Sequence, residues 1–266
     1  MLAEAKYQCA LVTGASAGLG AEFASQFAPD CASMVLVARR GERLLALANE
    51  LEGRHSGLKV YCFAVDLCSI DQRQKFFSRL KSKGLQPDLL VNNAGMGDVG
   101  AFASSDWGKI QSMMDLNMDA LTHCCHQFLP AMIAEQKGAI VNVSSLAATL
   151  PIPDFAVYAA TKAYVSSFSE ALSIELADHG VNVLAVCPGP VHTEFGETAK
   201  RGEQDRNVPG REYFYVEAQQ VVSESIWALE TGRTRVFPSL KITLAAVLIA
   251  ATPLFLLRKV MANTSS

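Results

Sequence analysis

The chain has 266 residues, half of them hydrophobic, with 23 basic and 26 acidic side chains and a formal net charge of −3. This length suits one large α/β domain better than two small ones, and it can bury a sizeable core. The slightly acidic balance, without any basic run, argues against nucleic acid as a partner.

Short apolar runs rich in β-branched residues alternate with longer amphipathic stretches. The runs cover residues 9–13, 33–38, 59–66, 89–94, 138–145 and 181–188, and helical patterns between them include residues 21–27, 42–53, 72–84 and 156–180. Most runs are apolar at consecutive positions, as expected of strands buried on both faces. The repeated β-α units predict a Rossmann-like, doubly wound parallel sheet with helices on both faces, in a single α/β domain covering residues 1–238.

The first apolar run is followed by "TGASAGLG", residues 13–20. Its glycines permit a tight turn and a close approach of backbone to a pyrophosphate, and the next helix supplies free N–H donors and a positive dipole. The spacing is G-x-x-x-G-x-G rather than G-x-G-x-x-G, and a glycine-rich turn without a ligand would look similar. The position between first strand and first helix favours a dinucleotide site, with contacts expected from Gly14, Ser16, Gly18, Leu19 and Gly20.

Arg39 and Arg40 directly follow the second run. In a dinucleotide-binding fold, a carboxylate at this position would bind the 2′-hydroxyl of NAD. A guanidinium is suited to a 2′-phosphate instead, so we predict a preference for NADP(H). The alternative is a solvated pair of arginines that opens a helix. Asp66, which ends the third run beside Leu67, is expected to meet the adenine ring, although an aspartate in a strand-end turn explains it nearly as well.

The seven cysteines are odd in number and scattered, without a CxxC pair or a signal peptide ahead of them. They predict free thiols in a reducing cytoplasm. Cys124 and Cys125 in "HCCH" point in different directions on a helix and have no partner cluster, so no metal site is expected.

Tyr158 and Lys162, in "YAATK", lie one turn apart on one face of a predicted helix. The pair is either an inert helix surface or an arrangement in which the lysine makes the phenol a usable acid at neutral pH. These residues alone do not decide between the two.

Six motifs follow one another along the chain: "TGASAGLG" at 13–20, "NNAG" at 92–95, Asn117, "VNVSS" at 141–145, "YAATK" at 158–162 and "PGPVHT" at 188–193. Each is a weak signal alone. In this order and at these separations, the chain resembles the short-chain dehydrogenase/reductase family over about residues 7 to 238.

The resemblance implies that Tyr158 gives a proton to a carbonyl oxygen or takes one from an alcohol. Lys162 would lower the pKa of Tyr158, since a nearby cation favours the phenolate, and would hold the nicotinamide ribose. Ser145, thirteen residues before Tyr158, matches the substrate-orienting serine; Ser144 is the competing choice but should face elsewhere. Asn117 would help to hold a water that connects the lysine to solvent.

For the cofactor, the resemblance implies that Asn93 stabilises the sheet and that Ala94 and Gly95 leave room beside it. The segment Pro188, Gly189 and Val191 would lie along the nicotinamide, with Thr193 contacting the carboxamide or a phosphate. The polar residues 194–212 match the mobile substrate lid of the family, which varies most among members.

The resemblance therefore implies an NADP(H)-dependent oxidoreductase that interconverts a small-molecule carbonyl and a secondary alcohol, working as a homo-oligomer, either dimer or tetramer. The alternative is a non-catalytic NADP(H)-binding regulatory or scaffold protein on the same fold. Such proteins usually lack the Tyr, Lys or Ser of the motif, all of which are present here.

The tail, residues 239–266, departs from this pattern. Residues 242–257 are sixteen in a row without a charge and contain Pro253. As a helix they would reach about 24 Å, short of a hydrocarbon core of about 30 Å. Three interpretations stay open: a buried element or subunit contact, a helix that lies in or partly inserts into the membrane–water interface, and a helix that spans the membrane. An apolar tail beside the lid would also fit a lipophilic substrate.

Overall fold

The computed structural model describes residues 5–201 and 211–264. Within them, seven parallel strands form one sheet in the order β3-β2-β1-β4-β5-β6-β7. The strands are β1 (Ala10–Thr13), β2 (Ser33–Ala38), β3 (Lys59–Ala64), β4 (Leu89–Asn92), β5 (Gly138–Val143), β6 (Val181–Val186) and β7 (Arg235–Val236). The order of the strands reverses between β1 and β4, and in open α/β sheets the ligand binds at such a switch point.

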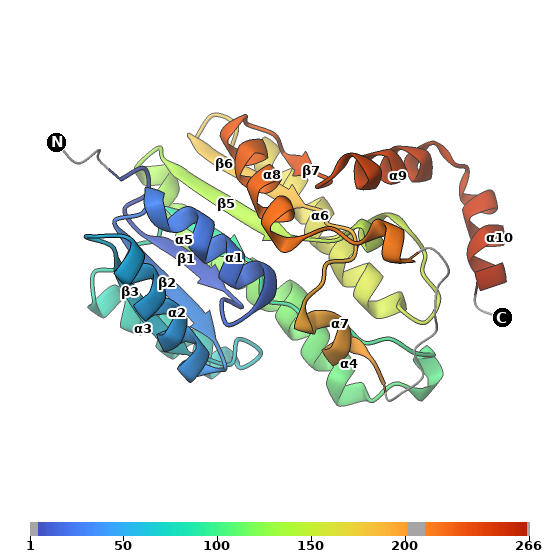
Figure 1. The fold of residues 1–266 in the computed structure, drawn as a ribbon, viewed down its shortest axis with the longest axis horizontal. Coiled ribbons are helices and arrows are strands. Elements are labelled where there is room, and N and C mark those ends of the chain that lie inside the picture. Colours follow the sequence, from blue (N-terminus) through green and yellow to red (C-terminus); the bar gives the residue numbers. More distant parts are fainter. Residues whose placement is uncertain (1–4, 202–210, 265–266) are drawn as a thin grey trace.

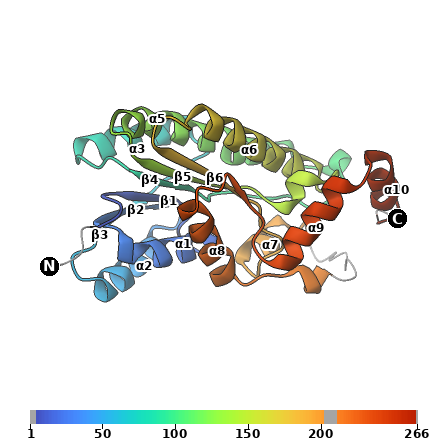
Figure 2. The same ribbon diagram turned by 90° about the horizontal axis from the view of Figure 1, so that it is seen from above.

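Helices cover both faces of the sheet (Figure 1). They are α1 (Gly18–Phe27), α2 (Gly41–Arg54), α3 (Ile70–Ser82), α4 (Trp107–Met114), α5 (Leu121–Ala134), α6 (Ala156–Glu175), α7 (Glu194–Ala199), α8 (Ala218–Glu230), α9 (Leu240–Ala251) and α10 (Leu254–Thr264). Figure 2 shows the sheet nearly edge-on, with α3, α5 and α6 on one side and α1, α2 and α8 on the other. The predicted doubly wound α/β fold is confirmed.

Each central strand packs on both helical layers. In β1, Val12 joins the apolar cluster under α1 and α2, whereas Leu11 joins the cluster under α3, α5 and α6. Both side chains are fully buried. Burial of one such side chain contributes about 1.5 to 3 kcal/mol, which explains why the runs are apolar at every position.

The six predicted runs correspond to β1 through β6. Four of them end two residues earlier than predicted, at 64, 92, 143 and 186 instead of 66, 94, 145 and 188. The chain leaves the ladder at these points because the next residues form loops at the carboxyl edge of the sheet. The two-residue strand β7 was too short to give a periodic signal.

The tail forms two helices, which break at Thr252 and Pro253. Ile242 and Ala246 are the buried residues of α9, and the described side chains of α10 are exposed or half-buried. The interpretation of the tail as a buried element is therefore wrong for most of its length. No single described helix has the length and apolarity to cross a membrane; α9 and residues 254–262 reach that threshold only as a pair, bent by 115°.

Candidate active site and cofactor cleft

The loop between β1 and α1 is shaped by glycine. Gly14 and Gly18 have φ angles of +67° and +55°, in the left-handed region that glycine adopts without strain. A Cβ atom on Gly20 would collide with the carbonyl oxygen of Gly14. The first turn of α1 carries no acidic residue, and Ala17 gives it no side-chain cap. Free N–H groups and a positive helix end therefore face the loop, as pyrophosphate binding requires.

The loops after β1 and β4 are tied together across the switch point. Thr13 Oγ1 accepts hydrogen bonds from the backbone N–H groups of Asn93 and Ala94, both at 3.0 Å. The side-chain amide of Asn93 in turn donates to the carbonyl oxygens of Thr13 at 3.0 Å and Gly14 at 3.4 Å. This network fixes the shape of the glycine-rich loop before any ligand arrives.

The two arginines after β2 differ in their contacts. Arg40 donates to Ser16 Oγ from Nε at 3.2 Å and from Nη2 at 3.0 Å, and its Nη1 lies 2.6 Å from a carboxylate oxygen of Glu194. Arg43, one turn later, donates to the other oxygen of Glu194 at 2.6 Å. Arg39 is exposed. Two guanidiniums thus converge on the carboxylate of Glu194, and Ser16 accepts from one of them, Arg40. A role of Arg39 at the cofactor remains a prediction.

Asp66 lies beyond the end of β3, and its Oδ1 accepts from the backbone N–H of Cys68 at 3.0 Å. This hydrogen bond is typical of a turn at the end of a strand, so Asp66 stabilises that turn. Leu67 is buried in the core beneath α3 and α5. A contact between Asp66 and the adenine ring remains a prediction.

Asn117 lies in a π-helical turn, Asp115–Ala120, between α4 and α5. Its amide donates to Met96 O at 2.9 Å and to Thr161 Oγ1 at 3.0 Å, and its oxygen accepts from Met96 N at 3.0 Å. A Cβ on Gly95 would lie 3.3 Å from Asn117 Oδ1 and 3.4 Å from Lys162 Nζ. The π-helical turn therefore places Asn117 beside Lys162. Turns of this kind are frequent at functional sites.

Ser144 and Ser145, which follow β5, point to different surroundings. Ser144 is buried and its hydroxyl bonds Lys162 O at 2.8 Å and Ser166 Oγ at 2.7 Å. Ser145 caps the short turn Leu146–Thr149 by accepting from Ala147 N at 3.1 Å. Its hydroxyl also interacts with the phenol of Tyr158, which lowers the pKa of that phenol.

Tyr158 and Lys162 are both buried, on the inner face of α6. Burial raises the pKa of Tyr158 to about 12, against the opposing effect of Ser145. Burial also lowers the pKa of Lys162 to about 8. The ammonium lies 5.8 Å from the centre of the Tyr158 ring and donates to Val143 O at 2.8 Å. Burial therefore decides the direction of the Tyr158 pKa shift, and the lowering of this pKa by Lys162 remains a prediction.

The segment after β6 packs against the turn that follows Ser145 and against the glycine-rich loop. Pro188 O accepts from Leu146 N at 2.8 Å, and Val191 forms an isolated parallel bridge with Val216. Gly189 faces the side chain of Ile242 from α9. Thr193 caps α7 and packs against Gly18 of the glycine-rich loop.

Helix α7 contacts both the arginines after β2 and the ring of Tyr158. Glu194, at its start, meets the arginines, whereas the ring of Phe195 lies 5.5 Å from that of Tyr158. Phe155 stacks on Tyr158, with ring centres 4.2 Å apart. The phenol ring therefore contacts two aromatic rings, one of which belongs to α7.

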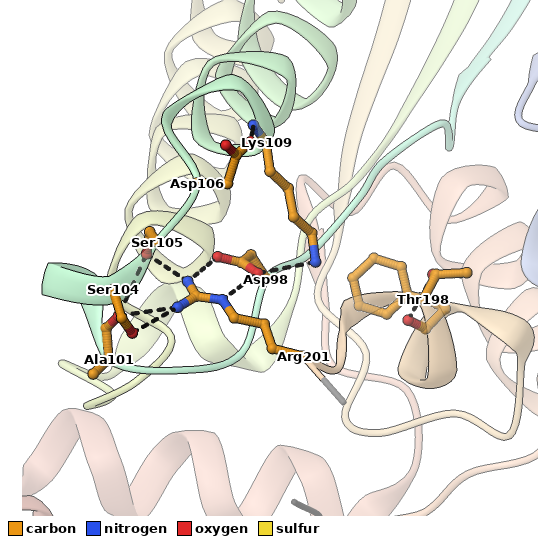
Figure 3. Close-up of polar contacts among 9 residues, drawn as sticks. Asp98, Ala101, Ser104, Ser105, Asp106, Lys109, Thr198 and Arg201 are labelled. Atoms are coloured by element: carbon orange, nitrogen blue, oxygen red, sulfur yellow. Dashed lines mark hydrogen bonds and ion pairs between the residues drawn. The ribbon is translucent and has the colours of Figure 1, made fainter. Parts of the chain in front are cut away.

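The end of α7 is fastened to the loop after β4 (Figure 3). Arg201 Nε donates to Asp98 Oδ1 at 2.8 Å, and the guanidinium also bonds Ala101 O, Ser104 and Ser105. Lys109 Nζ reaches the same carboxylate at 2.9 Å. These cations hold the pKa of Asp98 below its usual value. Residues 202–210 of the predicted lid lie outside the described residues.

Asp98 was missed from the sequence, because it belongs to no motif. Glu194, Phe195 and Arg201 fall in the predicted lid, but their contacts were not predicted, because their partners are distant in the chain. Arg43 could have been found, since it follows Arg39 and Arg40 at helical spacing on α2. In the two described ranges, no three His, Cys, Asp or Glu side chains gather in a way that could hold a metal ion.

Comparisons with known proteins agree with this arrangement. The family model described as short chain dehydrogenase matches residues 8–204. A sulfoacetaldehyde reductase of Chromohalobacter salexigens is 37% identical over 201 residues, which are 74% of this chain and 77% of that protein. A very-long-chain 3-oxoacyl-CoA reductase of Neurospora crassa is 36% identical over 178 residues, 65% of this chain and 53% of that protein.

Among solved structures, a short-chain dehydrogenase from Sphingobium yanoikuyae in complex with NADPH has a TM-score of 0.79. It is 30% identical, and the match covers 92% of this chain and 96% of that one.

Proposed function

Because this chain belongs to the short-chain dehydrogenase family, we propose that it is an NADP(H)-dependent oxidoreductase that interconverts a carbonyl compound and a secondary alcohol. The observation that carries the proposal is the buried grouping of Tyr158, Lys162 and Ser145 at the carboxyl edge of the sheet. The relatives named as reductases and dehydrogenases support the reaction class.

The cleft supports a dinucleotide with a 2′-phosphate. Gly14 and Gly20 leave backbone free to approach the pyrophosphate, and the uncapped start of α1 would bind it. Arg40 and Arg43 would hold the 2′-phosphate, because both already bind the carboxylate of Glu194, and Ser16, which accepts from Arg40, would lie beside it. Such a bound cofactor supplies or accepts the hydride.

We assign the proton transfer to Tyr158. With a pKa near 12 the phenol keeps its proton at neutral pH, so it can donate that proton to a carbonyl oxygen during reduction. In the reverse direction it accepts the proton of the alcohol. Ser145 would orient the reacting oxygen through its hydroxyl, and Lys162 and Asn117 would return a proton to the tyrosine through water.

The substrate end of the cleft is apolar. The side chains packed around Tyr158 are those of Met96, Met113, Ala147, Ile152, Phe155, Val157 and Phe195. Charged substrates would lose hydration there without gaining a partner. We therefore propose a ketone or aldehyde with an apolar substituent.

A turnover assay tests this function. NADPH consumption would be followed with short polar aldehydes and with a series of methyl ketones of increasing chain length. We expect kcat/KM to rise by about fourfold for each CH₂ group that enters the apolar cluster, from about 0.8 kcal/mol per group. Bound NADPH without turnover of any carbonyl would instead support the non-catalytic alternative. The homo-oligomeric state and the cytoplasmic location stay predictions.

A further inference from the structure

Helices α9 and α10 expose an unusual run of large apolar side chains. Their exposed fractions range from 42% to 75%, and the residues are Leu240, Leu244, Val247, Leu248, Leu254, Phe255, Leu256 and Val260. In Figures 1 and 2, α10 projects from the end of the molecule opposite the N-terminus. Contiguous apolar surface of this kind on a folded protein marks a binding surface.

The same segment is basic. Residues 239–266 contain three Arg or Lys residues, Lys241, Arg258 and Lys259, and no Asp or Glu, whereas the whole chain carries a net charge of −3. Arg258 and Lys259 are exposed on α10, beside Phe255 and Val260. This combination of apolar and cationic side chains complements a lipid surface with negatively charged headgroups.

The geometry favours a position along such a surface. At about 1.5 Å per residue, α9 and α10 are about 18 and 16 Å long, each well short of a hydrocarbon core of about 30 Å. The bend of 115° between them turns the second helix away from the axis of the first. A second copy of this surface would be a poorer partner, because pairing would bring Arg258 and Lys259 of both copies together with no carboxylate in either segment.

The base of α9 is fixed to the substrate end of the domain. Ile242 is buried against Gly189, and α9 contacts the turn Leu146–Thr149 that follows Ser145. Lys241 Nζ donates to Tyr215 O at 2.6 Å. A surface bound to this segment would therefore lie next to the active site.

We propose that α9 and α10 dock this protein on an anionic lipid bilayer, with their apolar side chains among the acyl chains and with Arg258 and Lys259 at the headgroups. This docking does not depend on the proposed function. The location of the membrane next to the cleft would give apolar substrates a short path to Tyr158.

Vesicle flotation of the full chain tests the proposal. We expect the protein to float with vesicles of phosphatidylcholine and phosphatidylglycerol, and less with phosphatidylcholine alone. The Leu248→Glu, Phe255→Glu double variant, changed at two exposed positions, should bind at least about tenfold more weakly, since each change removes a large apolar side chain that would enter the acyl chains and adds a negative charge. The Leu45→Glu, Ile174→Glu variant makes the same changes at exposed apolar positions of α2 and α6 and should float like the parent.

A second variant isolates the electrostatic part. Arg258→Gln, Lys259→Gln should reduce the preference for phosphatidylglycerol by about fivefold per residue and leave thermal unfolding unchanged. Equal flotation of the parent and the Leu248→Glu, Phe255→Glu variant would overturn the proposal. A second outcome would also overturn it: the parent does not float, and light scattering shows that the parent is a dimer whereas the Leu248→Glu, Phe255→Glu variant is a monomer. The surface would then bind a second copy of the chain.

Discussion

Glu194 and Arg40 are joined by a 2.6 Å ion pair that links the first turn of α7 to the N-cap residue of α2. Arg43 completes the pair from α2, again at 2.6 Å. A carboxylate and a phosphate compete for the same guanidinium donors. Under the proposed function, Glu194 occupies the position of the 2′-phosphate, so α7 would have to release the arginines for NADPH to bind.

The Glu194→Gln variant should bind NADPH more tightly, by about two- to fivefold, because an exposed ion pair no longer has to be broken. NADH has no 2′-phosphate, so its dissociation constant should change less. The matched control is Glu197→Gln on the same helix, whose carboxylate pairs with Lys200. Titration of both cofactors at fixed salt measures the effect; an equal gain for NADH would mean that Glu194 controls the cleft as a whole.

The Arg39→Ala, Arg40→Ala variant should lose about tenfold or more in NADPH affinity, since a hydrogen bond to a charged group is worth about 1.5 kcal/mol at the lower end. NADH binding should stay nearly the same, which also controls for misfolding. Arg54→Ala, which removes an arginine paired with Glu50 at the other end of α2, should leave both constants unchanged. An unchanged ratio of the two constants in the double variant would remove the main support for NADP(H).

Tyr158→Phe should lower turnover by at least about a hundredfold, the lower end of general acid catalysis, and leave NADPH affinity within a few-fold. Tyr164→Phe is the control, because Tyr164 lies on the same helix and its hydroxyl bonds Thr122 at 2.8 Å, away from the cleft. Turnover near the parent value in Tyr158→Phe would exclude this residue as the proton donor.

Lys162 should make the stability of the ligand-free protein depend on pH. Its pKa falls from 10.5 to about 8 on folding, so between these values the unfolded chain binds more protons and stability rises with pH. Lys162→Met lacks this gain. The difference in the free energy of unfolding between parent and variant should increase, in favour of the parent, by about 3 kcal/mol from pH 8 to 10.5.

Urea unfolding across this range measures that difference, and both proteins contain the same titrating cysteines, so their effect cancels. A difference that stays constant with pH would show that Lys162 is not desolvated in solution.

Asp98→Asn should loosen the end of α7. The side chain of Asp98 is 3% exposed, and its charge faces Arg201 and Lys109. Loss of that charge should cost about 1 to 3 kcal/mol of stability and make the chain more sensitive to trypsin at Arg201. Asp178→Asn, an exposed residue just beyond α6, is the control. Unchanged cleavage at Arg201 would mean that other contacts hold α7.

Much of the fold could be predicted from the sequence, because strands buried on both faces require apolar residues at every position. The residues of the glycine-rich loop, Asn117, Ser145 and the pair on α6 were predicted from their motifs, and the structure brings Ser145, Tyr158 and Lys162 together. The ends of the strands were placed too late, since residues such as Ala94 are apolar although they leave the sheet.

The contacts of α7 could not be predicted in the same way. Glu194 meets Arg40 across 154 positions and Asp98 meets Arg201 across 103, so each pairing depends on the tertiary fold rather than on a local pattern. The direction of the Tyr158 pKa shift was also inaccessible, because the depth of burial decides it. The break between α9 and α10 lies at Pro253, which cannot continue the hydrogen bonding of a helix, so the cause of this break is visible in the sequence.

The order of the strands also decides how the sheet can assemble while the chain leaves the ribosome. β1 can pair with β2 as soon as β2 has been synthesised. Its pairing with β4, in which Leu89 lies opposite Ala10, can form only later. After β4, each of β5, β6 and β7 pairs with the strand synthesised just before it, so the sheet then grows at a single edge with unpaired backbone groups. β7 ends that growth with two residues, too few to serve as a template for a strand of a neighbouring chain.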